Sequence, residues 1–474
     1  MKTKVFVIGF ILMLITSMAV MASGLGESTG SPARTSGVTT ITVWSNDAHD
    51  KAHMDLLIAQ YNNTTGRDKG IRIEYQVYGA DWNTAINMAL ETNRAPDMFK
   101  GGFANADAFQ AQGKFLPWTE IPGIQDILNA QAPYHRNLSS TFGGVPYGVV
   151  VYGNIPGFHY NKELVQRAGF SGPPRTWAEL EQQAIAISRL APEIYGIGIP
   201  LLWAPDFCHW VTEFAATSSL GQMYWNFADG RYEFEAFTEY FEMLARIREA
   251  NAIFPGMESL TDDQLRAHFA NGTVGFIWGA SWNVGVLYDQ FPFGGGTPGN
   301  PNNPAGWDFA PFPLRDANVQ YGTPFSASVF HYVNANVRND SNKLSAMQDV
   351  IRLFAGADTQ RIMYSLGLRL PINTAISSSA TTADRPQWTS VGQTADRFVT
   401  MPSAPHNMIA VEGADRAAVI AQILTGQIPR SGIRAALADL DRRMNAAFEQ
   451  AVSRGQIRRN DYIDPNFQSR LRAR

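Results

Sequence analysis

Hydrophobic residues follow strand and helix spacing in turn over the first hundred residues. Residues 39–44 alternate apolar and polar side chains as a strand does, and residues 71–77 form the next expected strand. The segment between them carries apolar residues at helical spacing, as do residues 82–92, which lead to a short strand at 95–99. This order of strands and helices predicts a parallel sheet, and ligands bind beyond the carboxyl ends of such strands.

Two short extended segments and a well-marked helix follow in the middle of the chain. The hydrophobic run at 145–152 is too short, and too closely flanked by glycine and proline, to be a helix, and a second extended run covers 158–162. Thr176 and Glu179 then form a T-x-x-E capping box, which predicts a helix that begins at Trp177.

The second half of the chain also carries strand and helix patterns. Strands are expected at 195–200 and 274–278, and the small residues 279–281 are expected to break the second strand before a helix that begins at Trp282. Residues 293–304 are rich in Gly, Pro and Asn and predict an exposed loop. Apolar residues at helical spacing predict further helices, at 207–216, 347–354, 360–366 and 433–448.

Length, charge and cysteine content narrow the class of protein. A chain of 474 residues is too long for one ordinary domain, so two or three are expected. The formal net charge is −4, and this mildly acidic balance argues against nucleic acid as a partner. Because Cys208 is the single cysteine, no intramolecular disulfide is possible and stability must come from packing.

The amino terminus has the pattern of a secretory signal peptide. A basic start and an apolar run at 5–15 precede Val20-Met21-Ala22, which fits the small-residue rule for cleavage after alanine. A membrane anchor is the alternative, but the apolar run is short and no basic stop signal follows it. No lipobox cysteine lies near the cleavage site. Residues 1–22 therefore predict a cleavable signal peptide and a freely soluble periplasmic protein, with residues 23–37 as a flexible leader.

Four short motifs in the middle of the chain occur in a fixed order. They are Gly-Val-Pro-Tyr at 144–147, Tyr-Asn-Lys-Glu-Leu at 160–164, Ala-Gly-Phe at 168–170 and Pro-Pro-Arg-Thr-Trp-Ala-Glu-Leu at 173–180. The series resembles the central signature of the extracellular solute-binding proteins of ABC transporters, and is most similar to the carbohydrate-binding family that includes maltose-binding protein. A pattern at 269–282, F-x-x-G-x-x-G-x-x-W-G-x-S-W, resembles the second strong signature of this family.

The resemblance implies the two-lobed α/β fold of periplasmic binding proteins, in which interleaved lobes are joined by a hinge and the ligand binds in the cleft. Residues 38–150 with 305–345 are expected to form lobe one, and residues 151–304 with 346–474 lobe two. The implied protein is a monomer that binds a sugar or oligosaccharide, delivers it to the membrane permease subunits of an ABC transporter, and has no catalytic activity, cofactor or metal. A secreted carbohydrate-active enzyme and a binding protein for a peptide or other polar solute are the alternatives.

Tryptophans and polar residues near strand ends are the candidate ligand-binding residues. Sugar rings pack their apolar faces on aromatic side chains and need hydrogen-bond partners for their hydroxyl groups. Trp282 follows a small-residue turn after a strand, where relatives commonly place a sugar-stacking tryptophan. For Trp203 and Trp210 a core role and a binding role are equally open, while Trp44 and Trp278 lie within strand patterns and are expected in the core. The expected ligand-binding set is Trp282, Asp47, Asn46, Gly101, Trp203, Trp210, Tyr147 and Arg369.

Patterns for other chemistry are weak. His49 and His53 are four residues apart, but no third ligand accompanies them, so a solvated helix face is favoured over a metal site. The glycine-rich segment 294–299 has no strand leading into it and predicts a flexible loop rather than a phosphate-binding one. Cys208 and His209 are adjacent in sequence, which does not itself make a nucleophile and base pair.

Overall fold

The computed structural model describes residues 37–472, apart from 104–105, 133–139, 204–206, 292–305, 330, 378–384, 393–397 and 401–403. The chain divides into two units, residues 1–37 and 38–474, and the fold below is that of the second unit. The expected signal peptide, nearly all of the expected leader and the expected loop at 293–304 lie outside the described residues. Within the described part of the chain, no helix has the length and apolar character needed to cross a membrane.

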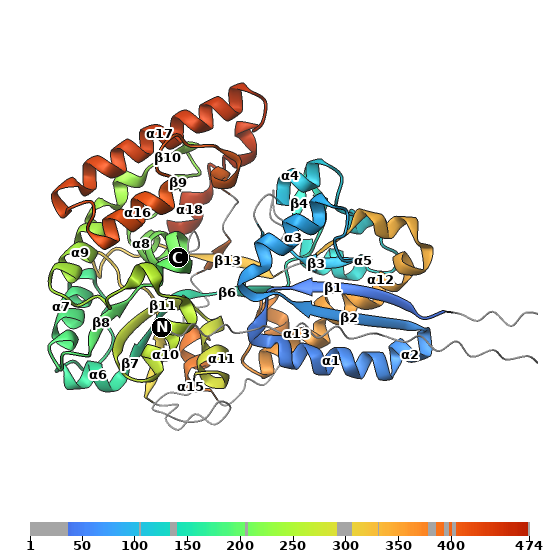
Figure 1. Ribbon diagram of the computed structural model, residues 1–474, viewed down its shortest axis with the longest axis horizontal. Coiled ribbons are helices and arrows are strands. Elements are labelled where there is room, and N and C mark those ends of the chain that lie inside the picture. The colour runs from blue at the N-terminus through green and yellow to red at the C-terminus, as the bar shows by residue number, and fades with distance from the viewer. Residues whose placement is uncertain are drawn as a thin grey trace, which may run out of the picture. The chain divides into compact units, whose positions relative to one another are not determined.

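The first sheet has the strand order β14-β3-β1-β2. Figure 1 shows β3, β1 and β2 of this sheet side by side. The strand β1 (Thr39–Ser45) runs parallel to β2 (Ile71–Val77) and to β3 (Met98–Lys100), while β14 (His331–Val333) is antiparallel to β3. Alternate residues of β1 and β2 are buried against helices, because the side chains of a strand point to opposite faces in turn. The helices that contribute to the cores around this sheet are α1 (Lys51–Asn63), α3 (Trp82–Glu91), α4 (Ala106–Ala111), α5 (Gln125–Gln131), α12 (Ser341–Ala355) and α13 (Ala357–Ser365). Short elements beside them are α2 (Thr65–Lys69), β4 (Thr141–Phe142) and β5 (Val145–Pro146).

The second sheet has the strand order β12-β7-β11-β8. The strand β8 (Tyr195–Gly198) is parallel to β11 (Val274–Ala280), whereas β7 (Pro156–Asn161) is antiparallel both to β11 and to β12 (Trp307–Ala310). Every residue of β7 and of β11 is buried, as expected for strands covered on both faces. The helices of the surrounding cores are α6 (Lys162–Arg167), α7 (Trp177–Ser188), α8 (Phe214–Leu220), α9 (Thr238–Glu249), α10 (Asp262–Ala270), α11 (Trp282–Asp289), α15 (Pro386–Gly392), α16 (Arg416–Thr425), α17 (Ile433–Ser453) and α18 (Phe467–Arg472). A small hairpin, β9 (Trp225–Asn226) and β10 (Arg231–Tyr232), packs beside α17.

A third, smaller sheet joins the other two and has the order β15-β6-β13-β16. The strand β6 (Tyr152–Asn154) continues through Ile155 into β7 of the second sheet, and β13 (Thr323–Val329) leads towards β14 of the first. These two strands are antiparallel neighbours (Figure 1), and β15 (Leu370–Pro371) pairs with β6 on its other side. The strand β16 (Phe398–Thr400) pairs with β13, and α14 (Thr374–Ser377) follows β15. The chain thus passes from the first sheet to the second along β6 and returns along β13.

Most of the expected elements form where the sequence pattern indicates. The capping box of Thr261 and Gln264 is complete and starts α10. At α7 the backbone N–H of Glu179 donates to Thr176 Oγ1 at 3.1 Å, as expected, but the Glu179 carboxylate accepts from the backbone N–H of Arg175 instead of completing the box.

The expected break at residues 279–281 is wrong. The strand β11 continues through Gly279 and Ala280, because both residues pair with Gly157 and Pro156 of β7. Only Ser281 separates the end of the strand from the first residue of α11. A small residue is needed at position 279 for a different reason: a Cβ atom there would lie 2.3 Å from the Asn283 side chain.

Two segments pack differently from the expected division into lobes. Residues 307–310, expected in lobe one, form β12 and pair with β7 of the second sheet. The helix α13 and most of α12, expected in lobe two, pack in the core of the first sheet, and α12 lies against β1. Amphipathic spacing reveals that a helix has a buried face but not which sheet covers it, and this explains the difference.

Residues 207–216, expected as one regular helix, start with an irregular turn. A π-helix covers Cys208–Glu213 and continues directly into α8. Such widened turns are rare and frequently occur at functional sites, because they change the direction of the side chains that follow.

Two buried histidines make the fold sensitive to acid. His159 in β7 is fully buried, and His331 in β14 is 8% exposed. Burial lowers the pKa of His159 from 6.5 to about 3. Burial, reinforced by the charges of Lys100 and Arg369 against the opposing effect of Asp47, lowers the pKa of His331 to about 4. Because folding lowers both pKa values, the associated stabilisation is complete above pH 6.5 and is lost as the pH falls towards the folded-state values.

We expect His159 and His331 together to make the free energy of unfolding fall by about 2–3 kcal/mol per pH unit between about pH 6 and pH 5, because both are protonated only in the unfolded chain. His406, whose pKa burial also lowers, adds to this slope. Urea denaturation at a series of pH values measures this slope. His331→Gln removes one of these groups and should lower the slope by about 1 kcal/mol per pH unit. A slope in His331→Gln identical to that of the parent would contradict the assignment.

Candidate functional site

Two acids and two bases form an ion network beyond the carboxyl ends of β1 and β3. Asp47 comes shortly after β1, and Lys100 is the last residue of β3. Arg369, just before β15, places its Nη2 atom 3.0 Å from Asp47 Oδ1 and 2.8 Å from Asp50 Oδ2. Its Nε atom donates to Asp50 Oδ2 at 2.8 Å, and Lys100 Nζ pairs with Asp47 Oδ1. The structure therefore brings together the predicted residues Asp47 and Arg369.

All four residues of this network are buried. Burial raises the pKa of Asp50, against the opposing effect of Arg369. Burial acts to lower the pKa of Arg369, but the carboxylates of Asp47 and Asp50 outweigh it and raise that pKa. The charges balance one another inside the network, so Asp47 presents an oriented, already paired carboxylate rather than an isolated charge.

The remaining predicted residues of the first lobe surround strand ends or loops. Asn46 precedes Asp47, and its Oδ1 atom is shielded from solvent and accepts no hydrogen bond from the described residues. Gly101 is buried directly after Lys100. Tyr147 is half-buried, and its ring lies edge-on to Phe142 with 5.7 Å between the ring centroids.

An aromatic pair at the ends of β1 and β2 was not part of the expected site. Trp44, which we expected in the core, is only half-buried, and its ring centroid lies 4.6 Å from that of Tyr78. Tyr78 comes directly after β2 and is also half-buried. The signal that identifies it is its position at the carboxyl end of a parallel strand, next to the end that carries Asn46 and Asp47.

The second lobe contributes a pair of tryptophans. Trp282 is the first residue of α11, and Trp210 lies in the π-helix Cys208–Glu213. Their ring centroids are 4.5 Å apart and their planes meet at 89°, so the rings pack edge to face. Trp210 is 9% exposed and Trp282 is half-buried. Trp278 is in the core, as expected, and the side chain of Trp203 lies outside the described part of the chain.

The helix α11 links the tryptophan pair to the ion network. It lies against the 3-10 turn Ala48–Asp50, which follows Asp47. A Cβ atom at Gly285 of α11 would lie 3.1 Å from the side chain of Leu368, the residue before Arg369. The segments that carry Trp282, Asp47 and Arg369 are therefore in contact.

The space beside the ion network is small. The cavity lined by Asp47 and Asp50 measures about 20 Å³, close to the size of one water molecule. A cavity of about 390 Å³ is lined by residues such as Pro156, Arg175 and Glu179, and none of the eight predicted residues lines it. The cavity lined by Asp47 and Asp50 is itself too small to hold a sugar ring.

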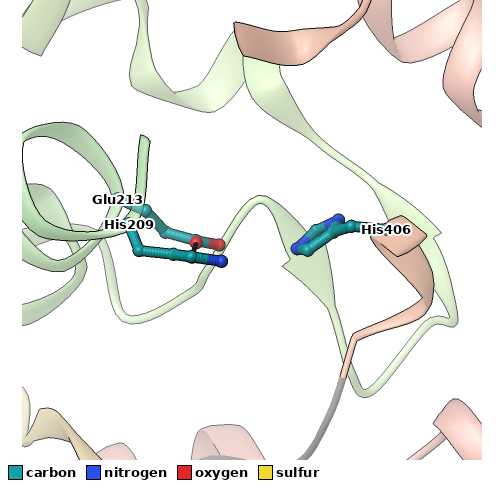
Figure 2. A group of neighbouring side chains, drawn as sticks. All are labelled: His209, Glu213 and His406. Carbon is teal, nitrogen blue, oxygen red and sulfur yellow. Dashed lines mark hydrogen bonds and ion pairs between the residues drawn. The ribbon is translucent and has the colours of Figure 1, made fainter. Parts of the chain in front are cut away.

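The π-helix also positions a second polar group, shown in Figure 2. His209 and Glu213 are four residues apart on this helix, and His209 Nδ1 lies 2.5 Å from Glu213 Oε2. His406, in the 3-10 turn Pro405–Met408, faces them, and one ligand atom from each of the three residues lies within 4.8 Å of the other two. Burial, with the positive charge of Arg416, lowers the pKa of His406. No local sequence pattern predicts this group, because His406 is far from His209 and Glu213 along the chain.

Comparison with known proteins places the chain in a family. Residues 49–340, more than half of the chain, match the family described as bacterial extracellular solute-binding protein. The chain belongs to this family, as the resemblance of its central motifs implied. Over 60 residues it is 37% identical to a binding protein of Brucella abortus (strain 2308), a match that spans 13% of this chain and 15% of that protein.

Several solved structures share the fold. A chitin oligosaccharide binding protein has a TM-score of 0.66 at 17% identity, covering 86% of this chain and 99% of that one. The sugar-binding protein MalE of Xanthomonas citri has a TM-score of 0.61 at 18% identity, covering 89% and 100%. The maltose/maltodextrin-binding domain MalE of Bdellovibrio bacteriovorus, bound to maltotriose, has a TM-score of 0.65 at 14% identity, covering 88% and 100%. At these identities the likeness shows the fold, which is the expected two-lobed fold of periplasmic binding proteins.

Proposed function

We propose that this protein is the substrate-binding component of an ABC importer and that it binds a sugar or oligosaccharide between its lobes. Membership of the solute-binding family is the observation that carries the role. The ligand class is supported by the half-buried Trp282, held edge-on by Trp210, because the apolar face of a sugar ring packs on such an aromatic plane. The names of proteins with the same fold, which include binders of chitin oligosaccharide and maltotriose, agree with this class.

The proposed site draws on both lobes. Trp282 and Trp210 supply the aromatic surface from the second lobe, and Asn46 and Asp47 supply acceptors for sugar hydroxyl groups from the first. The Oδ1 atom of Asn46 suits this role, since it is shielded from solvent and accepts no hydrogen bond from a described residue. Gly101, Tyr147, Trp203 and Arg369 stay predicted members of the site. For Arg369 we assign an indirect role, because its guanidinium is committed to Asp47 and Asp50.

Opening and closing of the lobes is part of the proposal. The cavity lined by Asp47 and Asp50, of about 20 Å³, does not hold a sugar ring, and α11 lies against the Ala48–Asp50 turn, so movement of α11 away from this turn is the opening that we propose. The strands β6 and β13, which join the two sheets, are the natural hinge. A bound sugar favours closure because it contacts both lobes only in the closed state.

The proposal also covers export, location, oligomeric state and partners. The protein is exported by its signal peptide, is free in the periplasm without a lipid anchor, acts as a monomer and binds no nucleic acid. It delivers its ligand to permease subunits and performs no covalent chemistry.

A ligand screen tests the function. We expect one or more oligosaccharides, but no amino acid or polyamine, to raise the melting temperature of the full chain, because a ligand that binds only the folded state stabilises it. With that sugar at saturation, small-angle scattering should show a smaller radius of gyration, and chromatography should recover the sugar intact. Release of a shorter sugar would favour the enzyme alternative. A shift with amino acids or peptides alone would favour a binding protein for another solute.

A further inference from the structure

We propose that His209, Glu213 and His406 bind a divalent transition-metal ion, and that zinc is the ion the group fits best. Two imidazoles and one carboxylate are donors that Zn²⁺ accepts readily, and three protein ligands with one open position are a known zinc arrangement. This site is separate from the ion network and from the pair of tryptophans, and it goes beyond the proposed binding of a sugar.

The positions of the three side chains suit one ion. Their ligand atoms lie within 4.8 Å of one another. Zinc holds nitrogen and oxygen ligands at about 2.0–2.2 Å, so tetrahedral ligands are about 3.5 Å apart, and the group needs to contract by about 1 Å. The His209 ring and the Glu213 carboxylate lie side by side, and the His406 ring faces both across a gap (Figure 2).

The free nitrogen of His406 points independently to a ligand. Its Nε2 atom is shielded from solvent and has no hydrogen-bond partner among the described residues. A buried polar atom without a partner is costly, typically about 1–3 kcal/mol, and a bound metal ion would remove this cost. The other ring nitrogen, Nδ1, lies 3.1 Å from the Tyr232 hydroxyl, so the ring is already held in place.

The other two ligands are also held by neighbours. Glu213 is fully buried, and its Oε1 atom accepts a hydrogen bond from the backbone N–H of Tyr224 at 2.7 Å. The ring of His209 stacks on that of Phe214 with 5.8 Å between centroids. Such outer contacts orient metal ligands, and their presence here means that the group needs little reorganisation to bind an ion.

A cavity beside His406 gives the ion access to the group, and charged neighbours affect its binding there. His406 lines a cavity of about 570 Å³, together with Val411, Arg416 and Met444, and this cavity provides a route for the ion. The positive charge of Arg416 opposes a cation there, while the carboxylate of Glu213 attracts it.

The bound ion would have a structural effect. It would tie the Pro405–Met408 turn to the π-helix, which also carries Trp210, the residue after His209. The expected result is a chain that zinc stabilises and that a chelator destabilises.

Zinc binding to the full chain tests the proposal. After treatment with a chelator, titration calorimetry with zinc chloride should show one equivalent bound, and cobalt should give the visible absorption of a low-coordinate nitrogen and oxygen site. His406→Gln and His209→Gln should each weaken zinc binding by at least about 10- to 100-fold, the loss typical of even an outer partner. Each variant should also lose the rise in melting temperature that zinc gives the parent.

His53→Gln is the matched control. His53 lies outside the group, and with His49 it forms the other pair of histidines that are four residues apart in the sequence. This variant should bind zinc as the parent does. No saturable binding to the parent, or unchanged binding in both His406→Gln and His209→Gln, would overturn the proposal. Loss of binding in His53→Gln alone would also overturn it and assign the metal to His49 and His53.

Discussion

Replacing Trp282 by alanine is expected to weaken binding of the sugar found in the ligand screen by about 5- to 150-fold. The change removes an indole surface that packs on the sugar, and burial of a large apolar side chain is worth about 1.5–3 kcal/mol. A loss of about 1–3 kcal/mol corresponds to this range of affinity. Trp282 is half-buried, so the variant should still fold, and titration calorimetry of the folded protein measures the effect directly.

Trp282→Phe is the matched comparison for this experiment. It keeps an aromatic ring at the start of α11 and its contact with Trp210, so it should retain most of the affinity that the alanine variant loses. If Trp282→Ala melts at a much lower temperature but binds sugar as tightly as the parent, Trp282 supports the core and does not contact the ligand.

Replacing Arg369 by methionine is expected to lower the free energy of unfolding by about 3–5 kcal/mol, the usual cost of leaving a buried charge without its partner. Arg369 is 3% exposed and contacts both Asp47 and Asp50. Without it Asp47 keeps its pair with Lys100, while Asp50 loses the ion pair with Arg369. Urea denaturation at neutral pH measures the change.

An exposed ion pair on the same lobe supplies the control. Arg338 pairs with Glu120, and the two side chains are 44% and 45% exposed. Arg338→Met should therefore cost no more than about 1 kcal/mol. Equal effects of Arg369→Met and Arg338→Met would show that the ion network does not contribute to stability as its burial implies.

Local structure followed closely from the sequence. Alternation predicted β2 at Ile71–Val77 to the residue, and the T-x-x-E pattern of Thr176 and Glu179 predicted the start of α7 at Trp177. These features depend on neighbours within a few residues. The lobe that α12 joins depends on which sheet its buried face meets, and β11 continues past Gly279 because β7 lies beside it. Contacts between distant segments of the chain decide both, and no local pattern contains them.

For the site too, local patterns predicted the positions of single residues but not which distant residues meet. Asp47 and Trp282 were chosen because they follow strands, and the structure places each at that position. The pairing of Asp47 with Arg369, and the meeting of His209 with His406, join segments that are far apart in sequence. The sequence also did not indicate that Asp50 and Lys100 complete the ion network, because an acid in a first helical turn and a lysine at a strand end are common on solvated surfaces.

The return of the chain along β13 has a consequence for synthesis. The edge of the first sheet is closed by β14, which pairs with β3. Roughly 230 residues separate these two strands, so at a translation rate of about 5–20 residues per second the ribosome makes the closing strand on the order of 10–50 s after its partner. During this interval β3 keeps an open edge, which is a template for pairing with other chains. A nascent chain that stops before residue 331 cannot complete the sheet, although its first three strands are already made.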